Sequence, residues 1–284
     1  MLRDKKIHRF FRSLPAFKGK GRLFRTLFYQ KLAGSKDILC TGDFGCQYLL
    51  PNLTESVSQT VFIYGIYEKN IHKLLNELLP ANGTFLDIGA NIGAVTIPLQ
   101  VKRPDVKIIA VEAAPWVYEY LQANLTRNQL HNITAVNRAI YDSDDLQLDF
   151  FSPEEGFGKG SLSPVFTNVA VKVSTITIDS LLRRQNAGKV DCMKVDVEGY
   201  EYHVFKGAAG LLQPAGAPDI LFEFVDWAEA RAGGIEKGDA QRILRQYGYT
   251  LFYINDNGIG AELADVLTEG SYMLYATKKR TARN

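Results

Sequence analysis

The chain has 284 residues, 46% of them hydrophobic and 23% charged, and a formal net charge of +2. This composition is typical of a soluble globular protein, and no internal repeat or low-complexity segment interrupts it. The three cysteines form no CxxC pair, which argues against a disulfide framework or a structural zinc site. No apolar run approaches the ~18 residues of a membrane span, and none follows the basic start as in a secretory signal. We therefore expect a cytoplasmic protein.

The small net charge conceals an uneven distribution along the chain. Through Lys36 there are 11 Lys or Arg residues and a single acid, Asp4, so this head carries about +10 and the remainder about −8. Within the head, apolar residues recur at helical spacing in two stripes: Ile7, Phe10, Phe11 and Leu14, then Leu23, Leu27 and Phe28. The pattern predicts a pair of basic amphipathic helices.

We divide the chain at residue 50, into a basic N-terminal extension over 1–50 and a larger domain over 51–284. The apolar stripes favour an accessory helical layer that packs on the larger domain or on a second subunit. A peripheral contact with an anionic membrane and an organellar transit peptide are the alternatives.

The segment 37–80 predicts a short antiparallel entry region, with a strand over Val57–Tyr64 and a helix over Ile71–Leu79. From Thr84 onward, apolar strands alternate with amphipathic helices, which is typical of a parallel, doubly wound sheet. Strands are expected at 84–88, 107–112, 133–138, 190–195, 219–225, 249–254 and 271–277, and helices near 91–101, 115–128, 177–186, 200–212 and 238–247.

Two features modify this parallel plan. No crossover helix separates the last two strands, so we expect them to pair antiparallel. The alternating segments 145–151 and 168–174 flank a Gly/Ser/Pro stretch and predict an inserted hairpin. The predicted fold is therefore α/β and Rossmann-like. It has a seven-stranded, mostly parallel sheet with an antiparallel last strand, helices on both faces, an N-terminal helical and strand extension, and a hairpin insertion.

The strand over 84–88 runs into a glycine-containing loop that suits a ligand. Gly89 permits a tight turn and a close approach of the backbone, and the helix that follows begins with unpaired N–H groups. The dinucleotide fingerprint G-x-G-x-x-G fails, because Asn91 and Ala94 occupy its second and third glycine positions. The loop is thus a poor match to a pyrophosphate site.

Two acids flank this loop in sequence. Asp87 places a carboxylate beneath the loop, where it suits a ligand with an ammonium or sulfonium charge. Glu112 ends the next strand, 19 residues after Gly93, where acids in such sheets hydrogen-bond ribose hydroxyls. Loop, helix, strand and acid within one ~30-residue unit predict a nucleoside-binding corner.

These residues resemble a known family. Asp87-x-Gly89-Ala90-Asn91-x-Gly93, followed by Glu112, is similar to the first motif and the ribose acid of class I S-adenosylmethionine-dependent methyltransferases. Within that class, four further strings in order resemble the FkbM-type methyltransferases: Gly65-Ile66-Tyr67-Glu68, Asn137-Arg138-Ala139-Ile140, Gly158-Lys159-Gly160-Ser161-Leu162 and Met193-Lys194-Val195-Asp196-Val197-Glu198-Gly199-Tyr200-Glu201. The similarity covers roughly residues 60–225 and leaves the basic head outside.

The resemblance implies methyl transfer from S-adenosyl-L-methionine, usually to a hydroxyl oxygen of a small-molecule or sugar acceptor. It does not choose the acceptor. The cofactor-binding residues that follow from it are Glu68, Asp87, Gly89, Ala90, Asn91, Gly93, Glu112, Ala139 and Asp196.

The reaction centre is expected at the end of the strand over 190–195. Alternation places Lys194 and Asp196 on one face of that strand, and Glu198 follows in the loop. We expect Asp196, Glu198 and Lys194 to be catalytic, with Asp196 or Glu198 taking the acceptor's proton. His203, one turn into the next helix, is a secondary candidate base.

Glu223, near the end of the neighbouring strand, adds a third acid to this crevice. Asp196, Glu198 and Glu223 could instead hold Mg²⁺ or a similar hard cation that acidifies the acceptor hydroxyl. We favour direct proton transfer and do not expect a divalent cation, because the sequence lacks a recognisable hard-cation motif.

Two other functions stay open: a nicotinamide-dependent oxidoreductase, and a catalytically inactive, methyltransferase-like docking module. The failed dinucleotide fingerprint argues against the first, and the acid set against the second. Nucleic acid is not an expected partner, because the body is net acidic. A homo-oligomer stays open. Since the head lies outside the resemblance, deleting residues 1–36 should leave donor binding intact.

Overall fold

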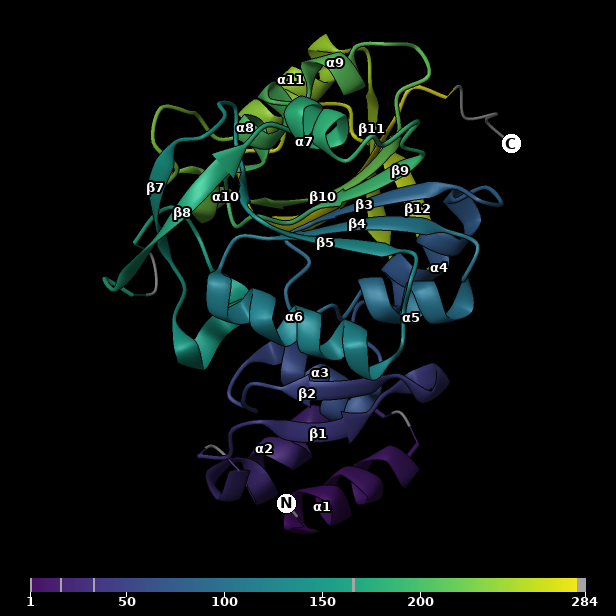
Figure 1. Ribbon diagram of the computed structural model, residues 1–284, viewed down its shortest axis with the longest axis vertical. Coiled ribbons are helices and arrows are strands. Elements are labelled where there is room, and N and C mark those ends of the chain that lie inside the picture. Colours follow the sequence, from purple (N-terminus) through teal and green to yellow (C-terminus); the bar gives the residue numbers. More distant parts are fainter. Residues whose placement is uncertain (1, 16, 33, 165–166, 280–284) are drawn as a thin grey trace.

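An eight-stranded sheet forms the centre of the protein, with helices on both of its faces (Figure 1). The computed structural model describes residues 2–15, 17–32, 34–164 and 167–279, so a few residues of both predicted domains lie outside the described part. The strands lie in the order β12-β11-β13-β10-β9-β3-β4-β5. Their bounds are β3 Thr84–Ile88, β4 Lys107–Glu112, β5 Ile133–Asn137, β9 Cys192–Val195, β10 Asp219–Val225, β11 Thr250–Asn255, β12 Gly258–Glu262 and β13 Ser271–Thr277.

The sheet is parallel in its centre and antiparallel at one side. Strands β10, β9, β3, β4 and β5 pair in parallel, as the alternation of strands and helices predicts. The last strand, β13, lies antiparallel between β10 and β11, which confirms that prediction. The predicted count of seven strands is wrong, because β12 adds an edge strand beside β11. This short strand opens on a glycine, so its sequence carries little β pattern.

Buried side chains form two apolar clusters that fall on opposite faces of the sheet. Phe85 belongs to one and Leu86 to the other, because successive strand residues point to opposite faces. The first face is covered by α4 (Lys69–Leu78), α5 (Thr96–Lys102) and α6 (Pro115–Arg127), and the second by α7 (Ile178–Arg184), α8 (Glu201–Lys206), α9 (Ala209–Leu212) and α11 (Asp239–Gln246) (Figure 1). The short α10 (Asp226–Glu229) follows β10. No helix in the described part of the chain is both long and apolar enough for a membrane crossing.

The segment expected as a strand over Val57–Tyr64 is a helix, α3 (Ser56–Tyr64), so that prediction is wrong. The carboxylate of Glu55 caps the helix by accepting two N–H groups of its first turn. Gly65 ends it in the left-handed conformation, at φ 89°. The helix is rich in β-branched and aromatic residues and is buried on most sides, so it lacks the amphipathic period that identifies a surface helix.

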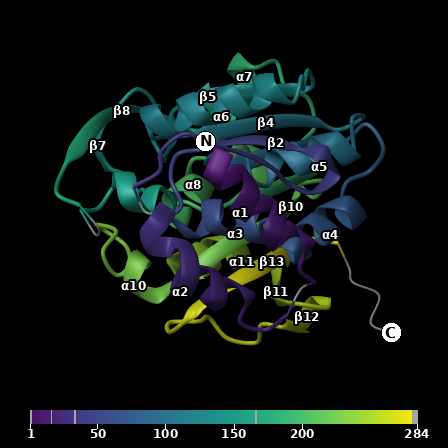
Figure 2. The same cartoon turned by 90° about the horizontal axis from the view of Figure 1, so that it is seen from below.

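The basic head forms two helices, α1 (Leu2–Ser13) and α2 (Lys20–Leu32), at one end of the molecule (Figures 1 and 2). The predicted antiparallel entry region follows as β1 (Ile38–Thr41) and β2 (Gln47–Leu50), joined through the 3-10 turn η1 (Asp43–Gly45).

The inner faces of these two helices pack on the body. Phe11 and Phe24 are fully buried with ring centroids 5.2 Å apart, and the ring of Phe24 lies 5.8 Å from that of Phe62 in α3. The guanidinium of Arg12 pairs with Asp43 at 2.5 Å. Head and body therefore share one apolar cluster, which confirms the accessory helical layer.

Two residues of the predicted stripes point outward instead. Phe10 and Leu27 are each 49% exposed, while Phe24, outside the predicted stripe, is buried. The division of the chain at residue 50 stays a prediction.

The predicted hairpin insertion is present and antiparallel. It consists of β7 (Gln147–Phe151) and β8 (Ala170–Ile176), and it projects to one side of the sheet (Figure 1). The two-residue strand β6 (Ala139–Ile140) pairs with β8 in parallel. Between β7 and β8, the 3-10 segment η2 (Glu154–Lys159) approaches the N-terminus of α3.

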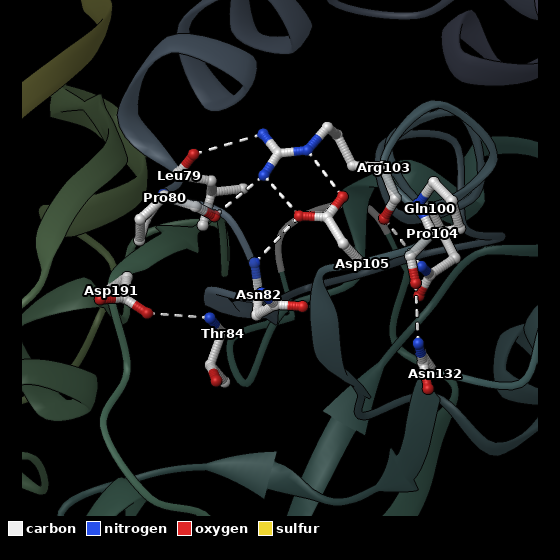
Figure 3. Close-up of polar contacts among 10 residues, drawn as sticks. All are labelled: Leu79, Pro80, Asn82, Thr84, Gln100, Arg103, Pro104, Asp105, Asn132 and Asp191. Carbon is white, nitrogen blue, oxygen red and sulfur yellow. Dashed lines mark hydrogen bonds and ion pairs between the residues drawn. The ribbon is translucent and has the colours of Figure 1, made fainter.

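A polar network fastens the turns at the amino ends of β3 and β4 (Figure 3). Arg103 forms an ion pair with Asp105 at 2.8 Å and donates to the carbonyl oxygens of Leu79 and Pro80. Asp105 accepts the N–H of Asn82 at 3.0 Å. This network lies at the amino ends of these strands. It is therefore opposite the carboxyl ends, at which open parallel sheets bind ligands.

Replacing Phe24 with alanine should lower the free energy of unfolding by about 3–5 kcal/mol, because the ring is fully buried between head and body. The matched change Leu27→Ala, on the same helix but half exposed, should alter it by no more than about 0.5 kcal/mol. Urea denaturation of both variants measures the difference.

The same packing adds an expectation for the removal of residues 1–36, which stays predicted to leave donor binding intact. That deletion would uncover Phe62 of α3, which packs on Phe24. We now expect a destabilised protein, and equal unfolding energies for Phe24→Ala and Leu27→Ala would contradict this account of the head.

Candidate active site

A cavity of about 230 Å³ opens at the carboxyl ends of β3, β4, β9 and β10, where open parallel sheets bind ligands. The first turn of α3 and the residues 158–160 line it from the other side. Its charged lining comprises six acids and three bases: Glu55, Asp87, Glu112, Asp196, Glu198 and Glu223, with Arg138, Lys159 and Lys194. Acids therefore outnumber bases in the lining of the cavity.

The glycine loop after β3 is held close to the end of β9. Gly89 has φ 81°, and a Cβ atom there would lie 1.9 Å from the carbonyl oxygen of Asp196. The N–H groups of Gly89 and Ala90 both donate to the carbonyl oxygen of Val111, at 3.0 and 2.9 Å. Only glycine fits this position, because both the backbone conformation and the lack of space exclude a side chain.

Glu112 braces the same loop from the end of β4. Its carboxylate accepts the N–H of Asn91 at 2.9 Å and that of Ala114 at 2.8 Å. Burial raises the pKa of Glu112 to about 7, against the effect of these hydrogen bonds. Glu112 lines the cavity, as expected of an acid that meets ribose hydroxyls.

The ammonium group of Lys194 lies at the centre of the site. It donates to Asp196 at 2.7 Å and lies 3.8 Å from Glu68, while its side chain is only 3% exposed. Burial alone would lower the pKa of Lys194, but the carboxylates of Asp196, Glu68 and Asp87 together raise it well above the usual range. Lys194 is therefore a fixed positive charge.

One carboxylate oxygen in the cavity wall near this lysine, Oδ1 of Asp87, lacks a hydrogen-bond partner among the described residues. Oε2 of Glu68 lies outside the lining and pairs with the ammonium group of Lys194 at 3.8 Å. The other oxygen of Asp87 accepts the hydroxyl of Thr96 at 2.5 Å. Burial raises the pKa of Asp87, and it raises that of Glu68 to about 7. An unpartnered buried oxygen in a cavity wall marks a place where a ligand can donate a hydrogen bond or bring a cation.

The loop after β9 is held by an acid that the sequence analysis did not single out. Oε1 of Glu201 accepts the N–H groups of Val197 and Gly199, at 3.0 and 3.4 Å. Between these two anchors, Glu198 adopts the left-handed conformation, at φ 54°. A non-glycine residue in that conformation is held by its surroundings, and Glu201 provides the hold. The only sequence signal was a third acid in the string that ends at Glu201.

Asp196, Glu198 and Glu223 converge on one side of the cavity. One carboxylate oxygen from each lies within 4.8 Å of the others. Burial, followed by the charge of Asp196, raises the pKa of Glu198 to about 8 and that of Glu223 to about 10. Such a cluster can hold and release protons near neutral pH, or it can bind a hard cation such as Mg²⁺.

Most of the predicted site residues line the cavity. The four that do not are Glu68, Gly93, Ala139 and the secondary candidate base His203. Lining it are Asp87, Gly89, Ala90, Asn91, Glu112, Lys194, Asp196, Glu198 and Glu223. Glu68 lies outside the lining and contacts Lys194 at 3.8 Å. Ala139 is buried and lies in sequence between two lining residues, Arg138 and Ile140. Gly93 faces the side chains of Ile97 and Leu121, so it serves the packing of the helix that follows.

His203, the secondary candidate base, is held elsewhere. Its Nδ1 lies 3.0 Å from Asp142, and its ring stacks on Tyr141 at 4.6 Å. It is not among the residues that line the cavity. Glu55, in contrast, lines the cavity although it was not predicted as a site residue. It was overlooked because the segment that follows it was expected to be a strand.

Comparison with known proteins gives one family and several relatives. The model of the methyltransferase FkbM domain matches residues 87–251, more than half of the chain. Methyltransferase sdnD of Sordaria araneosa is 32% identical over 177 residues, which cover 51% of this chain and 68% of that protein. Hexuronic acid methyltransferase AglP of Haloferax volcanii is 28% identical over 146 residues, which cover 51% of this chain and 58% of that protein.

Among solved structures, precorrin-6y C5,15-methyltransferase from Geobacter metallireducens aligns with a TM-score of 0.44 at 14% identity, covering 75% of this chain and 93% of that chain. TYW2 of M. jannaschii in complex with AdoMet aligns with a TM-score of 0.41 at 16% identity, covering 86% and 87%.

The raised pKa of Glu198 predicts how stability depends on pH. Its folded-state pKa of about 8 exceeds the ordinary value of 4.5, so between these values the folded protein holds a proton that the unfolded chain has lost. The free energy of unfolding of the ligand-free protein should therefore fall as the pH rises from about 5 to about 8. Glu198→Gln should reduce this fall, as measured by urea denaturation across the pH series.

The exposed Glu269 provides the matched control, since Glu269→Gln makes the same chemical change at the surface. An identical pH dependence in Glu198→Gln and Glu269→Gln would show that Glu198 is not protonated in the folded state.

Proposed function

The chain belongs to the FkbM methyltransferase family, and we propose that it methylates a hydroxyl oxygen of a sugar or another small hydroxylated acceptor. It is a methyltransferase that uses S-adenosyl-L-methionine as its cofactor. The observation that carries the proposal of O-methylation is the pair of carboxylates, Asp196 and Glu198, that line the cavity beside the glycine loop.

The cavity residues fit this cofactor. Its sulfonium and ammonium groups are cationic, and Asp87 offers a buried, unpartnered carboxylate oxygen that a cation would satisfy. Glu112, at the end of β4, is the proposed partner of the ribose hydroxyls. Gly89, Ala90 and Asn91 would contact the cofactor through the backbone, since they line the cavity beside Glu112.

Three other predicted cofactor residues would act indirectly. Glu68 would help to fix Lys194, which lies 3.8 Å away. Gly93 and Ala139 would support the residues beside them that line the cavity. None of the three lines the cavity itself in the described structure.

When bound, S-adenosyl-L-methionine supplies an electrophilic methyl group on a sulfonium centre. Glu198 would take the proton that the acceptor hydroxyl loses, and a pKa of about 8 makes it an effective base close to neutral pH. Asp196, held by Lys194 at 2.7 Å, would orient the same hydroxyl. Glu223, whose pKa of about 10 keeps it protonated at neutral pH, can donate a hydrogen bond to a second acceptor oxygen.

Two observations support a sugar-type acceptor. The relative AglP is by name a hexuronic acid methyltransferase. The lining of the cavity also includes two bases, Arg138 and Lys159. Their side chains can bind the hydroxyl or carboxylate oxygens of a polar acceptor. The family match argues against the nicotinamide-dependent oxidoreductase, and the converging acids argue against an inactive docking module.

The experiment that tests O-methylation measures transfer from methyl-labelled S-adenosyl-L-methionine to a panel of uronic acids, neutral sugars and other hydroxylated small molecules. Product analysis should find the label on oxygen. Labelled products that carry the methyl group on nitrogen or carbon alone would refute the proposal.

Gly89→Ala should weaken binding of S-adenosyl-L-methionine at least about a hundredfold, because the new methyl group would collide with the carbonyl oxygen of Asp196 and require a disfavoured φ. Isothermal titration calorimetry measures the affinity. Gly188→Ala is the matched control, since nothing lies within 4 Å of the added Cβ there. Wild-type affinity in a folded Gly89→Ala protein would contradict the placement of the cofactor.

Glu198→Gln should lower kcat by about 10²–10⁴-fold while leaving the affinity for the cofactor nearly unchanged, because the base is removed and the shape kept. In the wild type, kcat/KM should rise with pH towards about 8, the pKa of Glu198, and the variant should lose this rise.

Addition of EDTA distinguishes direct proton transfer from the alternative in which the three acids hold a cation. Direct proton transfer predicts full activity in the presence of the chelator. Loss of activity that Mg²⁺ restores would instead assign Asp196, Glu198 and Glu223 to a metal.

A further inference from the structure

We propose that the outer face of α1 and α2 docks the protein on an anionic lipid membrane. This face is defined by Lys5, Lys6, Arg9, Phe10, Phe17, Lys18, Arg22, Arg25 and Leu27, and we call it the basic face. The proposal concerns a surface outside the cavity and does not depend on the identity of the methyl acceptor.

The basic face contributes no residue to the buried core. The inner sides of both helices already bury Ile7, Phe11 and Phe24 against the body. In Figure 2, α1 and α2 lie in front of the rest of the molecule, so their outer sides face away from it. The residues of the basic face are exposed, so the side opposite the packed one is open to a partner.

The charge of this face is strongly positive and uncompensated. Among the described residues, none forms an ion pair with one of its six cations: Lys5, Lys6, Arg9, Lys18, Arg22 and Arg25. The head contains a single acid, Asp4, before residue 37. Each cation near an anionic bilayer favours binding, and this electrostatic attraction weakens as the salt concentration rises, so we expect a salt-sensitive contact.

Three large apolar side chains stand among these cations. Phe10, Phe17 and Leu27 are 49%, 43% and 49% exposed. Phe10 lies in α1, Leu27 in α2 and Phe17 in the connection between the two helices. Exposed single apolar residues are common, but phenylalanine and leucine interleaved with lysine and arginine are typical of interfacial membrane helices. Such side chains can enter the boundary between headgroups and acyl chains.

A groove beside α1 extends the same basic surface. It has a volume of about 740 Å³, and Lys5, Arg9, Arg12 and Arg127 are among the residues that line it. None of the residues that line it is an acid. It can therefore accept the phosphate of a lipid headgroup.

The apolar side chains favour a membrane over a nucleic acid as the partner. A nucleic acid would also match the positive charge, but it offers Leu27 no apolar environment. A bilayer matches both the charge and the apolar residues, and the expected binding then depends on lipid charge, on salt and on Phe10 and Leu27.

The test is flotation of the full-length protein with vesicles of phosphatidylcholine, with and without 30% phosphatidylglycerol. We expect binding to the anionic vesicles at low salt, weak binding to the neutral ones, and release of the bound protein in 1 M salt. Binding to neither, or equal binding to both, would overturn the proposal.

Two variants and one control localise the contact. Lys6→Glu, Arg9→Glu and Arg25→Glu together should weaken binding to anionic vesicles at least about tenfold. Phe10→Ser with Leu27→Ser should weaken it severalfold while leaving its salt dependence. The control Lys69→Glu, Lys73→Glu and Lys107→Glu makes the same change of net charge at exposed positions outside the head and should leave binding unchanged.

Equal losses in the charge variant and in the control would refute docking through the basic face, because net charge alone would then explain binding. Thermal unfolding checks that each variant is folded. Displacement of the vesicles by a short RNA, together with full binding of the Phe10→Ser, Leu27→Ser variant, would point to nucleic acid and also refute the proposal.

Discussion

The buried ammonium group of Lys194 is the charge on which the rest of the site depends. It lies on β9 within reach of Asp196 and Glu68, and Lys194 is paired in register with Asp87 on the neighbouring strand β3. Three carboxylates so close together and so deeply buried would repel one another strongly without a cation between them. One lysine therefore allows acids from three segments of the chain to gather beside the cavity, where the parallel strands end.

Backbone conformation then sets the distances around that charge. Gly89 lets the loop after β3 touch the end of β9, and the left-handed conformation at Glu198 turns its carboxylate into the cavity. Glu112 and Glu201 each hold one of these loops by accepting backbone N–H groups. Acids thus serve two purposes here, since some brace the loops and others remain to meet the ligand.

Much of this arrangement could be predicted from the sequence, because its strands carry strong local signals. Each of the predicted sheet strands is present, and the acids at the ends of β3, β4 and β9 follow directly from them. The helix α3 was mistaken for a strand because it is buried on most sides, which removes its period. The same error hid Glu55. Glu201 was missed because bracing a loop leaves no pattern in sequence.

The basic head likewise has some features that the sequence predicts and others that only the folded structure shows. The sequence alone predicts a strongly basic head over residues 1–36, helices with apolar stripes within it, and a glycine-containing loop after a buried strand. The folded structure was needed to show that Phe24 is buried while Phe10 and Leu27 are exposed, and that the head shares its core with α3. Periodicity and turn chemistry are local properties of the chain, whereas the face of a helix that is covered depends on contacts between segments far apart in sequence.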